Sequence, residues 1–224
     1  MIKLIAALTM FVDHFGIIFF PDVYAFRIIG RLSMPLFAYC IARGFYFSRQ
    51  RGSITKYCRN MVILAIVSQV PYYMMCGEGY NIGFTWLFSL LLLMIATSYR
   101  FKLWVRALLF SAAGAVLVAL ELSGLCAVDY GICGIITPLL FYLLMKKGLE
   151  NFINYAIAIL CGWGVFVLSS GSPTSLAQIF SVGSAAVLPI AKKYDGKIKL
   201  PKWFFYGFYP VHILILLIVR YLVA

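Results

Sequence analysis

The sequence contains two histidines, and both stand in long apolar segments. His14 lies in the first of these segments, directly after Asp13, and His212 lies in the last. A neutral imidazole kept away from water is the usual general base at neutral pH. A buried histidine can also serve only to bond a backbone carbonyl. The pair therefore marks a candidate site for proton transfer, with a structural role as the alternative.

Two arginines stand near the start of the second apolar segment. Arg27 and Arg31 are four residues apart and so fall on one face of a helix. Because an ionisable group in lipid is costly, it normally faces a partner or a water-filled cavity. Asp13 and Arg31 are expected at similar depths on neighbouring antiparallel helices, which predicts an ion pair between them. That pair is either a structural lock between two helices or part of a functional site.

The elements that must position these residues are membrane helices. Of 224 residues, 64% are hydrophobic and only 12% are charged, and the mean hydropathy is +0.98. A soluble domain needs more charge to cover its surface. The net charge of +12 is spread over short loops and forms no basic face or tail, which argues against nucleic-acid binding. The pattern predicts one transmembrane domain over residues 1–224.

The expected fold is all-α, a polytopic transmembrane helical bundle of about nine helices (roughly 8–10). Gly and Pro residues between apolar runs mark the turns, and the first run is interpreted as a retained helix, not a signal peptide. The predicted spans cover 4–20, 26–48, 60–76, 82–99, 103–122, 127–145, 152–169, 175–191 and 203–222.

Every second loop between these spans is basic, which is the positive-inside pattern. The alternate loops hold acidic residues instead, among them Asp22, Glu78 and Asp129. The sequence therefore predicts a multi-pass protein of the plasma or inner membrane with a cytoplasmic amino terminus. The basic loops contain Arg49, Arg51, Lys56, Arg59, Arg100, Lys102, Arg106, Lys146, Lys147, Lys192, Lys193, Lys197, Lys199 and Lys202.

Other chemistries find little support. The sequence has no Gly-x-Ser-x-Gly, no His-Glu-x-x-His and no phosphate-binding glycine loop. Its six cysteines lack metal-ligand spacing, so no metal site is predicted. Cys76 and Cys126 both fall near the predicted outer face, which leaves a disulfide between them open.

Four segments resemble one family of membrane proteins. They are Leu-Thr-Met-Phe-Val-Asp-His-Phe-Gly at 8–16 with Phe-Phe-Pro-Asp at 19–22; Arg-Ile-Ile-Gly-Arg-Leu-Ser-Met-Pro-Leu-Phe-Ala-Tyr-Cys-Ile-Ala-Arg-Gly-Phe at 27–45; Ser-Gln-Val-Pro at 68–71; and Tyr-Gly-Phe-Tyr-Pro-Val-His at 206–212. These motifs are similar to those of the TraX family, which in turn resembles a larger superfamily of multi-pass membrane acyltransferases.

The resemblance implies transfer of an acetyl group from cytoplasmic acetyl-CoA to an amine or hydroxyl on the opposite side. It assigns the catalytic base to His14 and a second catalytic histidine to His212. Asp13 and Arg31 are also expected to be catalytic, with Arg27 or Arg31 orienting the acceptor or stabilising the oxyanion. Arg27 and Tyr209 are expected to contact the acceptor, either a pilin-like peptide amino terminus or a cell-envelope glycan. The phosphates of the donor are expected on basic residues, for which a purely topogenic role is the alternative. These residues are Arg43, Arg49, Arg51, Arg106 and Lys202.

Two other functions remain open at this stage. A small-molecule or proton-coupled transporter would use Asp13, His14, Arg27 and Arg31 as a midplane site. A non-catalytic partner in an envelope assembly would need neither histidine. The expected partners are the lipid bilayer and the acceptor, without nucleic acid, and oligomer formation is left open.

Overall fold

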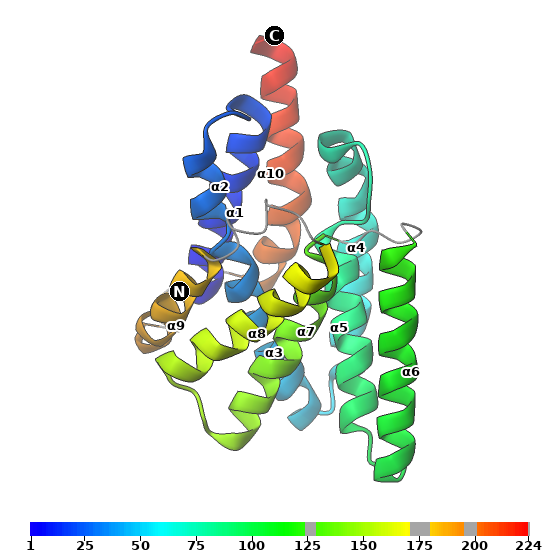
Figure 1. The fold of residues 1–224 in the computed structure, drawn as a ribbon. Helices are drawn as coiled ribbons and strands as arrows, with labels where there is room; N and C mark the ends of the chain where they lie inside the picture. Colours follow the sequence, from blue (N-terminus) through cyan, green and yellow to red (C-terminus); the bar gives the residue numbers. More distant parts are fainter. Residues whose placement is uncertain (124–128, 171–179, 195–200, 224) are drawn as a thin grey trace.

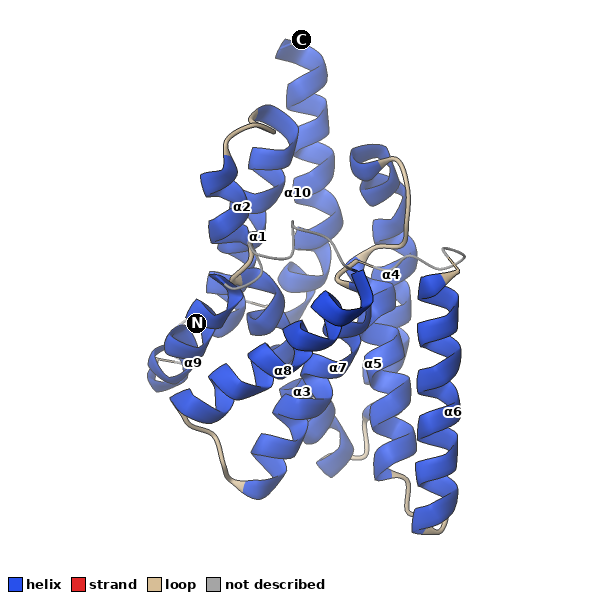
Figure 2. Ribbon diagram, in the orientation of Figure 1, coloured by secondary structure: helices blue, strands red, loops and turns tan. Residues whose placement is uncertain are grey.

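A computed structural model describes residues 1–123, 129–170, 180–194 and 201–223, without the side chains of 120–122, 164–170 and 202–203. Within these residues the structure has ten α-helices, a 3₁₀ turn at 180–183 and no strand (Figure 2). The helices are α1 (Ile2–Phe19), α2 (Tyr24–Gly30), α3 (Ser33–Gln50), α4 (Ile54–Cys76), α5 (Ile82–Thr97), α6 (Leu103–Leu122), α7 (Gly131–Lys147), α8 (Phe152–Ser170), α9 (Ser184–Lys193) and α10 (Lys202–Val223).

The predicted helical membrane bundle is confirmed. Each predicted span corresponds to one helix, except that α2 and α3 together occupy the second span and α9 is short. Part of the predicted span 175–191 lies outside the described residues. Within the described ranges, three segments are long and apolar enough to cross a membrane, namely Ile2–Phe19, Tyr24–Gln50 and Phe204–Val223.

The second span is interrupted at Arg31 and Leu32, between α2 and α3. Pro35 explains the position of the break. A proline has no backbone N–H to donate to the carbonyl four residues earlier, and its ring collides with that carbonyl. The carbonyl concerned belongs to Arg31. The continuous helix expected over 26–48 therefore divides where one of the predicted site residues stands.

The turn between α4 and α5 is held by buried amide side chains. Gly77 ends α4 in the left-handed region at φ 80°. Asn81 then caps α5 by accepting a hydrogen bond from the Gly83 amide at 2.8 Å. The Asn81 side-chain amide donates to the Ala65 carbonyl at 2.7 Å and to Gln69 Oε1 at 2.8 Å. These bonds fix the amino-terminal end of α5 against α4.

Helix α1 lies between α2, α3 and α10 (Figure 1). Its buried residues Ile2, Ala6, Met10, Asp13 and His14 recur at helical spacing. The α1–α2 turn and the carboxyl terminus lie at one end of the molecule, and the α5–α6 and α7–α8 turns lie at the other (Figure 1). The buried stripe of α1 therefore brings its two ionisable residues to a junction of several helices.

Candidate functional site

The two histidines, 198 positions apart in the chain, meet in the core between α1 and α10. Nδ1 of His14 lies 2.7 Å from Nε2 of His212. The two rings are nearly parallel, with an interplanar angle of 2° and centroids 4.9 Å apart. Both residues are buried, with 6% and 4% of their surface exposed. The structure thus brings together the two residues that the sequence singles out first.

The hydrogen bonds of this pair determine which ring nitrogens carry protons. Nδ1 of His212 lies 2.6 Å from the Phe208 carbonyl, which only accepts, so that nitrogen is the donor. In a neutral ring Nε2 of His212 is then an acceptor, and Nδ1 of His14 must donate to it. This leaves the lone pair of His14 on Nε2. No hydrogen bond from the described part of the chain reaches that atom, so it is available as a base.

The carboxylate of Asp13 forms an ion pair with Arg27. The predicted ion pair between Asp13 and Arg31 is wrong. Nη1 of Arg27 donates to both carboxylate oxygens at 3.0 Å. Arg31 makes no ion pair with Asp13 among the described residues. Asp13 does not pair with Arg31 because α1 and α2 approach each other closely beside the carboxylate. A Cβ added to Gly30 would lie 2.2 Å from Oδ1 of Asp13, so the carboxylate fills the space beside that glycine.

Two buried polar atoms near the histidines lack a hydrogen-bond partner among the described residues. They are Nε of Arg31 and the hydroxyl oxygen of Tyr209. The Arg31 guanidinium lies over the ring of Tyr130, 5.6 Å from its centroid. The Tyr209 ring centroid lies 6.0 Å from the centroids of both histidines. Since burying an unpaired polar group is costly, both atoms indicate a place for a polar ligand.

One polar cavity of about 220 Å³ lies beside these groups, and His212 is not among its described lining residues. The sequence predicted five of its lining residues as site residues. These are Asp13, His14, Arg27, Arg31 and Tyr209. Five further polar residues of the wall were not predicted: Ser33, Tyr72, Cys76, Asp129 and Tyr130.

Asp129 is the most informative of the missed residues. It lies outside the helices, two residues before α7 begins. Burial raises the pKa of its carboxyl to about 6, although Arg31 opposes this shift. One feature of the sequence could have identified it: Asp129 stands next to an aromatic residue, Tyr130, in a loop predicted at the same end of the bundle as Arg31. The distribution of charges among the loops placed Asp129 in an acidic loop and indicated no further role for it.

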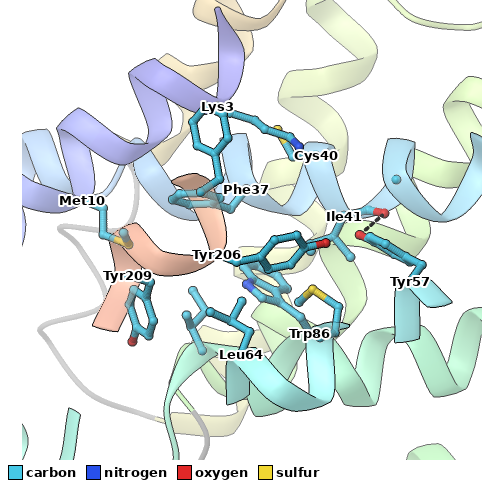
Figure 3. A pocket seen from close by; sticks show the side chains of 14 residues that line it. Lys3, Met10, Phe37, Cys40, Ile41, Tyr57, Leu64, Trp86, Tyr206 and Tyr209 are labelled. Carbon is cyan, nitrogen blue, oxygen red and sulfur yellow. Dashed lines mark hydrogen bonds between the residues drawn. The ribbon is translucent and has the colours of Figure 1, made fainter. Parts of the chain in front are cut away.

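A second cavity of about 110 Å³ adjoins the first and is mainly apolar. Met10, Ile82 and Tyr209 line both cavities. In Figure 3, Tyr209 stands beside Met10 at one end of the apolar cavity, and Tyr57 and Ile41 lie at the other. The one charged residue among its described lining is Lys3, whose ammonium lies 5.4 Å from the Phe205 ring centroid. The molecule thus holds an apolar and a polar compartment with a common wall.

Of the basic residues predicted to bind the donor, the four whose side chains are described, Arg43, Arg49, Arg51 and Arg106, line neither cavity. Arg49 donates to Oγ1 of Thr97 at 2.6 Å and also to the Thr97 carbonyl. Arg106 donates to the Ala96 carbonyl at 3.4 Å.

The guanidinium groups of Arg43 and Arg51 lie over the Phe47 ring, at 5.8 and 5.9 Å from its centroid. The side chain of Lys202 lies outside the described residues, as does Cys126, the suggested partner of Cys76. No group of three or more candidate metal ligands occurs within the described residues.

Comparison with known proteins connects this chain to a family. The sequence is 26% identical over 246 residues to the probable fimbrial assembly protein FimC, serogroup H1, of Dichelobacter nodosus, covering 96% of this chain and 92% of that protein. It is 37% identical over 46 residues to an uncharacterised protein of Rickettsia prowazekii (strain Madrid E), covering 20% and 18% of the two chains. No solved structure matches. The family model described as TraX protein matches residues 1–220, and the chain therefore belongs to the TraX family.

Proposed function

We propose that this protein is a multi-pass acyltransferase of the plasma or inner membrane that moves an acetyl group from acetyl-CoA to an amine or hydroxyl acceptor. The observation that carries the proposal is the hydrogen-bonded chain from the Phe208 carbonyl through His212 to His14. It leaves one basic nitrogen, Nε2 of His14, at a polar cavity inside the membrane bundle. A general base in such a place suits the activation of a weak nucleophile.

The reaction follows from these groups. An acceptor amine or hydroxyl in the polar cavity gives its proton to Nε2 of His14 as it attacks the thioester carbonyl. The positive charge that develops on His14 is shared through Nδ1–H with His212. When the carbon–sulfur bond breaks, the thiolate takes the proton from His14, and acetylated acceptor and CoA leave. His212 thus orients the base and steadies its charged form, as a third group does in catalytic triads.

The apolar cavity gives the donor a route to the site. The thiol-bearing arm of CoA is slender and carries few charges, which suits a cavity lined by Met10, Phe37 and Trp86. Lys3 lies among the lining residues of this cavity. The phosphates of the donor would then remain outside, where Lys3 and the predicted basic residues supply positive charge. With the amino terminus cytoplasmic, as the positive-inside rule predicts, the donor enters from the cytoplasm.

The acceptor would enter the polar cavity from the opposite side. This cavity includes Cys76 at the end of α4 and Asp129 before α7. The curated relative in Dichelobacter nodosus is named as a probable fimbrial assembly protein. Together with the pilin acetylation expected of the family, this supports a peptide amino terminus as the acceptor, and an envelope glycan hydroxyl is the alternative. Arg27 and Tyr209 would contact it.

The test is thermal stability of the detergent-purified protein with acetyl-CoA, CoA or ATP. A ligand that binds only the folded state raises Tm with its concentration. We expect acetyl-CoA and CoA to raise Tm in a saturable way in the wild type and in His14→Ala, with no shift for ATP. Acetyl transfer, followed with radiolabelled acetyl-CoA, should be lost in His14→Ala alone. If no thioester shifts Tm, the enzyme proposal falls and a transporter becomes the better explanation.

A further inference from the structure

Tyr209 occupies the boundary between the two cavities. It is one of three residues that line both, and the other two, Met10 and Ile82, have apolar side chains. It lies on α10 three residues before His212, so both side chains emerge on the same face of that helix. In Figure 3 its hydroxyl oxygen points away from Tyr206, which lines the middle of the apolar cavity. The one polar side chain shared by the two compartments is therefore a phenol.

The hydroxyl of Tyr209 has no hydrogen-bond partner among the described residues, although the residue is buried, with 5% of its surface exposed. Native proteins seldom leave such a group unsatisfied unless a ligand or water completes it. Ile82, the first residue of α5, lines both cavities as Tyr209 does, and it carries a backbone amide. That amide is among the first N–H groups of a helix, which have no partner within the helix. The buried Asn81 cap holds this helix end in place.

We propose that the Tyr209 hydroxyl is the oxyanion donor of the acyl transfer. The proposal rests on the proposed function and deepens it. A thioester whose arm fills the apolar cavity and whose acceptor sits in the polar cavity has its carbonyl at their common boundary. The Tyr209 hydroxyl lies at this boundary without a hydrogen-bond partner among the described residues, so it can donate to the carbonyl oxygen. The positive end of the α5 dipole at Ile82 favours the negative charge that develops on the same oxygen.

With Tyr209 as the oxyanion donor, every bond and proton of the transfer step is accounted for. As the acceptor attacks, the new bond to the carbonyl carbon forms, its proton passes to Nε2 of His14, and the carbonyl π pair moves onto oxygen. Tyr209 donates a hydrogen bond to that oxygen and keeps its own proton. When the carbon–sulfur bond breaks, the pair returns to the carbonyl and the thiolate takes the proton from His14. Tyr209 is thus unchanged at the end of each turnover.

Two other side chains with N–H donors at the polar cavity, Arg27 and Arg31, are less well placed for this role. Nη1 of Arg27 is engaged by both oxygens of Asp13. Arg31 lies over the Tyr130 ring and lines the polar cavity only. A side chain that donates a hydrogen bond to the thioester oxygen must reach the place where the arm of acetyl-CoA ends. Among these three side chains only Tyr209 borders both compartments.

The experiment compares Tyr209→Phe with wild type in release of CoA from acetyl-CoA, with and without a short peptide that offers a free amino terminus. The substitution removes one oxygen and keeps the ring between the cavities. Loss of one oxyanion donor typically lowers kcat by about 10²–10³-fold. We expect that loss in kcat, with KM for acetyl-CoA changed less than about threefold. The matched control is Tyr142→Phe, because Tyr142 is buried on α7 and lines neither cavity.

A second readout separates hydrogen bonding from packing. S-acetonyl-CoA carries a ketone that is not cleaved, and its carbonyl stretch moves to lower frequency when the oxygen accepts a hydrogen bond. We expect this shift in the wild type and in Tyr142→Phe but not in Tyr209→Phe. Wild-type kcat in Tyr209→Phe, or the same carbonyl frequency in both proteins, overturns the role of Tyr209. Absence of CoA release and of analogue binding in the wild type would instead refute the proposed function, and this inference with it.

Discussion

Two buried polar clusters in this molecule have opposite character. The first surrounds His14 and consists of the polar cavity, the Asp13–Arg27 ion pair and two atoms without partners. The second surrounds Glu150, in the turn between α7 and α8. Oε1 of Glu150 accepts hydrogen bonds from the hydroxyls of Tyr39 and Tyr155, both at 3.0 Å. The ammonium of Lys192 lies 3.0 Å from the same oxygen.

The difference shows which polar groups serve the fold and which are available to a ligand. In the Glu150 cluster one carboxylate oxygen accepts from Tyr39 on α3, Tyr155 on α8 and Lys192 on α9, and the cluster lines neither described cavity. A satisfied network makes a structure rigid and specific. In the described part of the chain, the His14 cluster keeps a lone pair, a guanidinium nitrogen and a hydroxyl without hydrogen-bond partners beside a cavity. Substitutions should therefore separate activity from stability in one cluster and alter stability alone in the other.

The largest effect is expected from His14→Gln. This change removes the base while keeping a polar side chain of similar reach. General-base catalysis contributes about 10²–10⁴-fold, so acetyl transfer should fall by that factor. Thermal unfolding of the purified protein should stay close to that of the wild type. Wild-type turnover in this variant would remove the functional distinction between the two clusters.

A smaller effect, this time on stability, is expected from Gly30→Ala. The added methyl would lie within 2.3 Å of the Asp13 carboxyl group and force α1 and α2 apart. Overpacking of this kind costs about 1–3 kcal/mol. Gly114→Ala on α6 is the matched control, because nothing lies within 4 Å of its added methyl. Thermal unfolding of the two variants should show a lower Tm only for Gly30→Ala. Equal Tm values would mean that the close approach beside Asp13 is unimportant.

The effect of His212→Ala should be weaker than that of His14→Gln, because His212 acts through its neighbour. Loss of a supporting partner typically costs about 10–100-fold in activity. The nitrogen-15 NMR spectrum of the side chains gives a readout that a merely structural role would not change. In the wild type, Nδ1 of His14 should be protonated and Nε2 bare, and in His212→Ala this tautomer preference should weaken. A wild-type spectrum with the opposite tautomer would refute the proton order derived above.

The sequence predicted the helices well because length and hydropathy determine a membrane helix almost alone. It also identified His14 and His212, since ionisable residues in apolar segments are rare enough to be noticed singly. The Asp13–Arg31 pair was wrong for a local reason. Depth along a helix was estimated correctly, but the side facing Asp13 depends on Gly30 and on the break at Arg31. Both features depend on how the helices pack against each other, which the periodicity of apolar residues in the sequence does not reveal.

The wall of the polar cavity was harder to predict. Asp129 and Tyr130 reach it from a turn preceding α7, and Tyr72 and Cys76 reach it from the end of α4. Their membership in the wall depends on how segments far apart in the sequence pack around one space, which no single segment encodes. The apolar cavity shows the same limit. Its lining residues look like ordinary lipid-facing or core residues in the sequence, and only the packing of α1, α3, α4, α5 and α10 brings them together.

The smallest effect is expected from Glu150→Gln, which tests the satisfied cluster. Burial alone would raise the pKa of the Glu150 carboxyl, but hydrogen bonds from Lys192, Tyr155 and Tyr39 hold it below its ordinary value of 4.5. A carboxyl with a lowered pKa stabilises the folded state above its unfolded pKa, and this contribution is lost as the pH falls through the folded pKa. The variant should therefore lose about 1–2 kcal/mol at pH 7, a modest amount because the cluster is partly exposed.

The difference in Tm between wild type and Glu150→Gln should accordingly be present at pH 7 and shrink below about pH 4.5. Acetyl transfer at pH 7, measured well below either Tm, should be unchanged, since Glu150 borders neither cavity. The decisive comparison is with His14→Gln, which should show the reverse, an unchanged Tm and lost transfer. If Glu150→Gln lowered transfer without lowering Tm, full hydrogen-bond satisfaction would not distinguish a structural cluster from a functional one. The carboxylate in the α7–α8 turn would then belong to the catalytic machinery, acting on the donor from the end of the molecule where the basic loops lie.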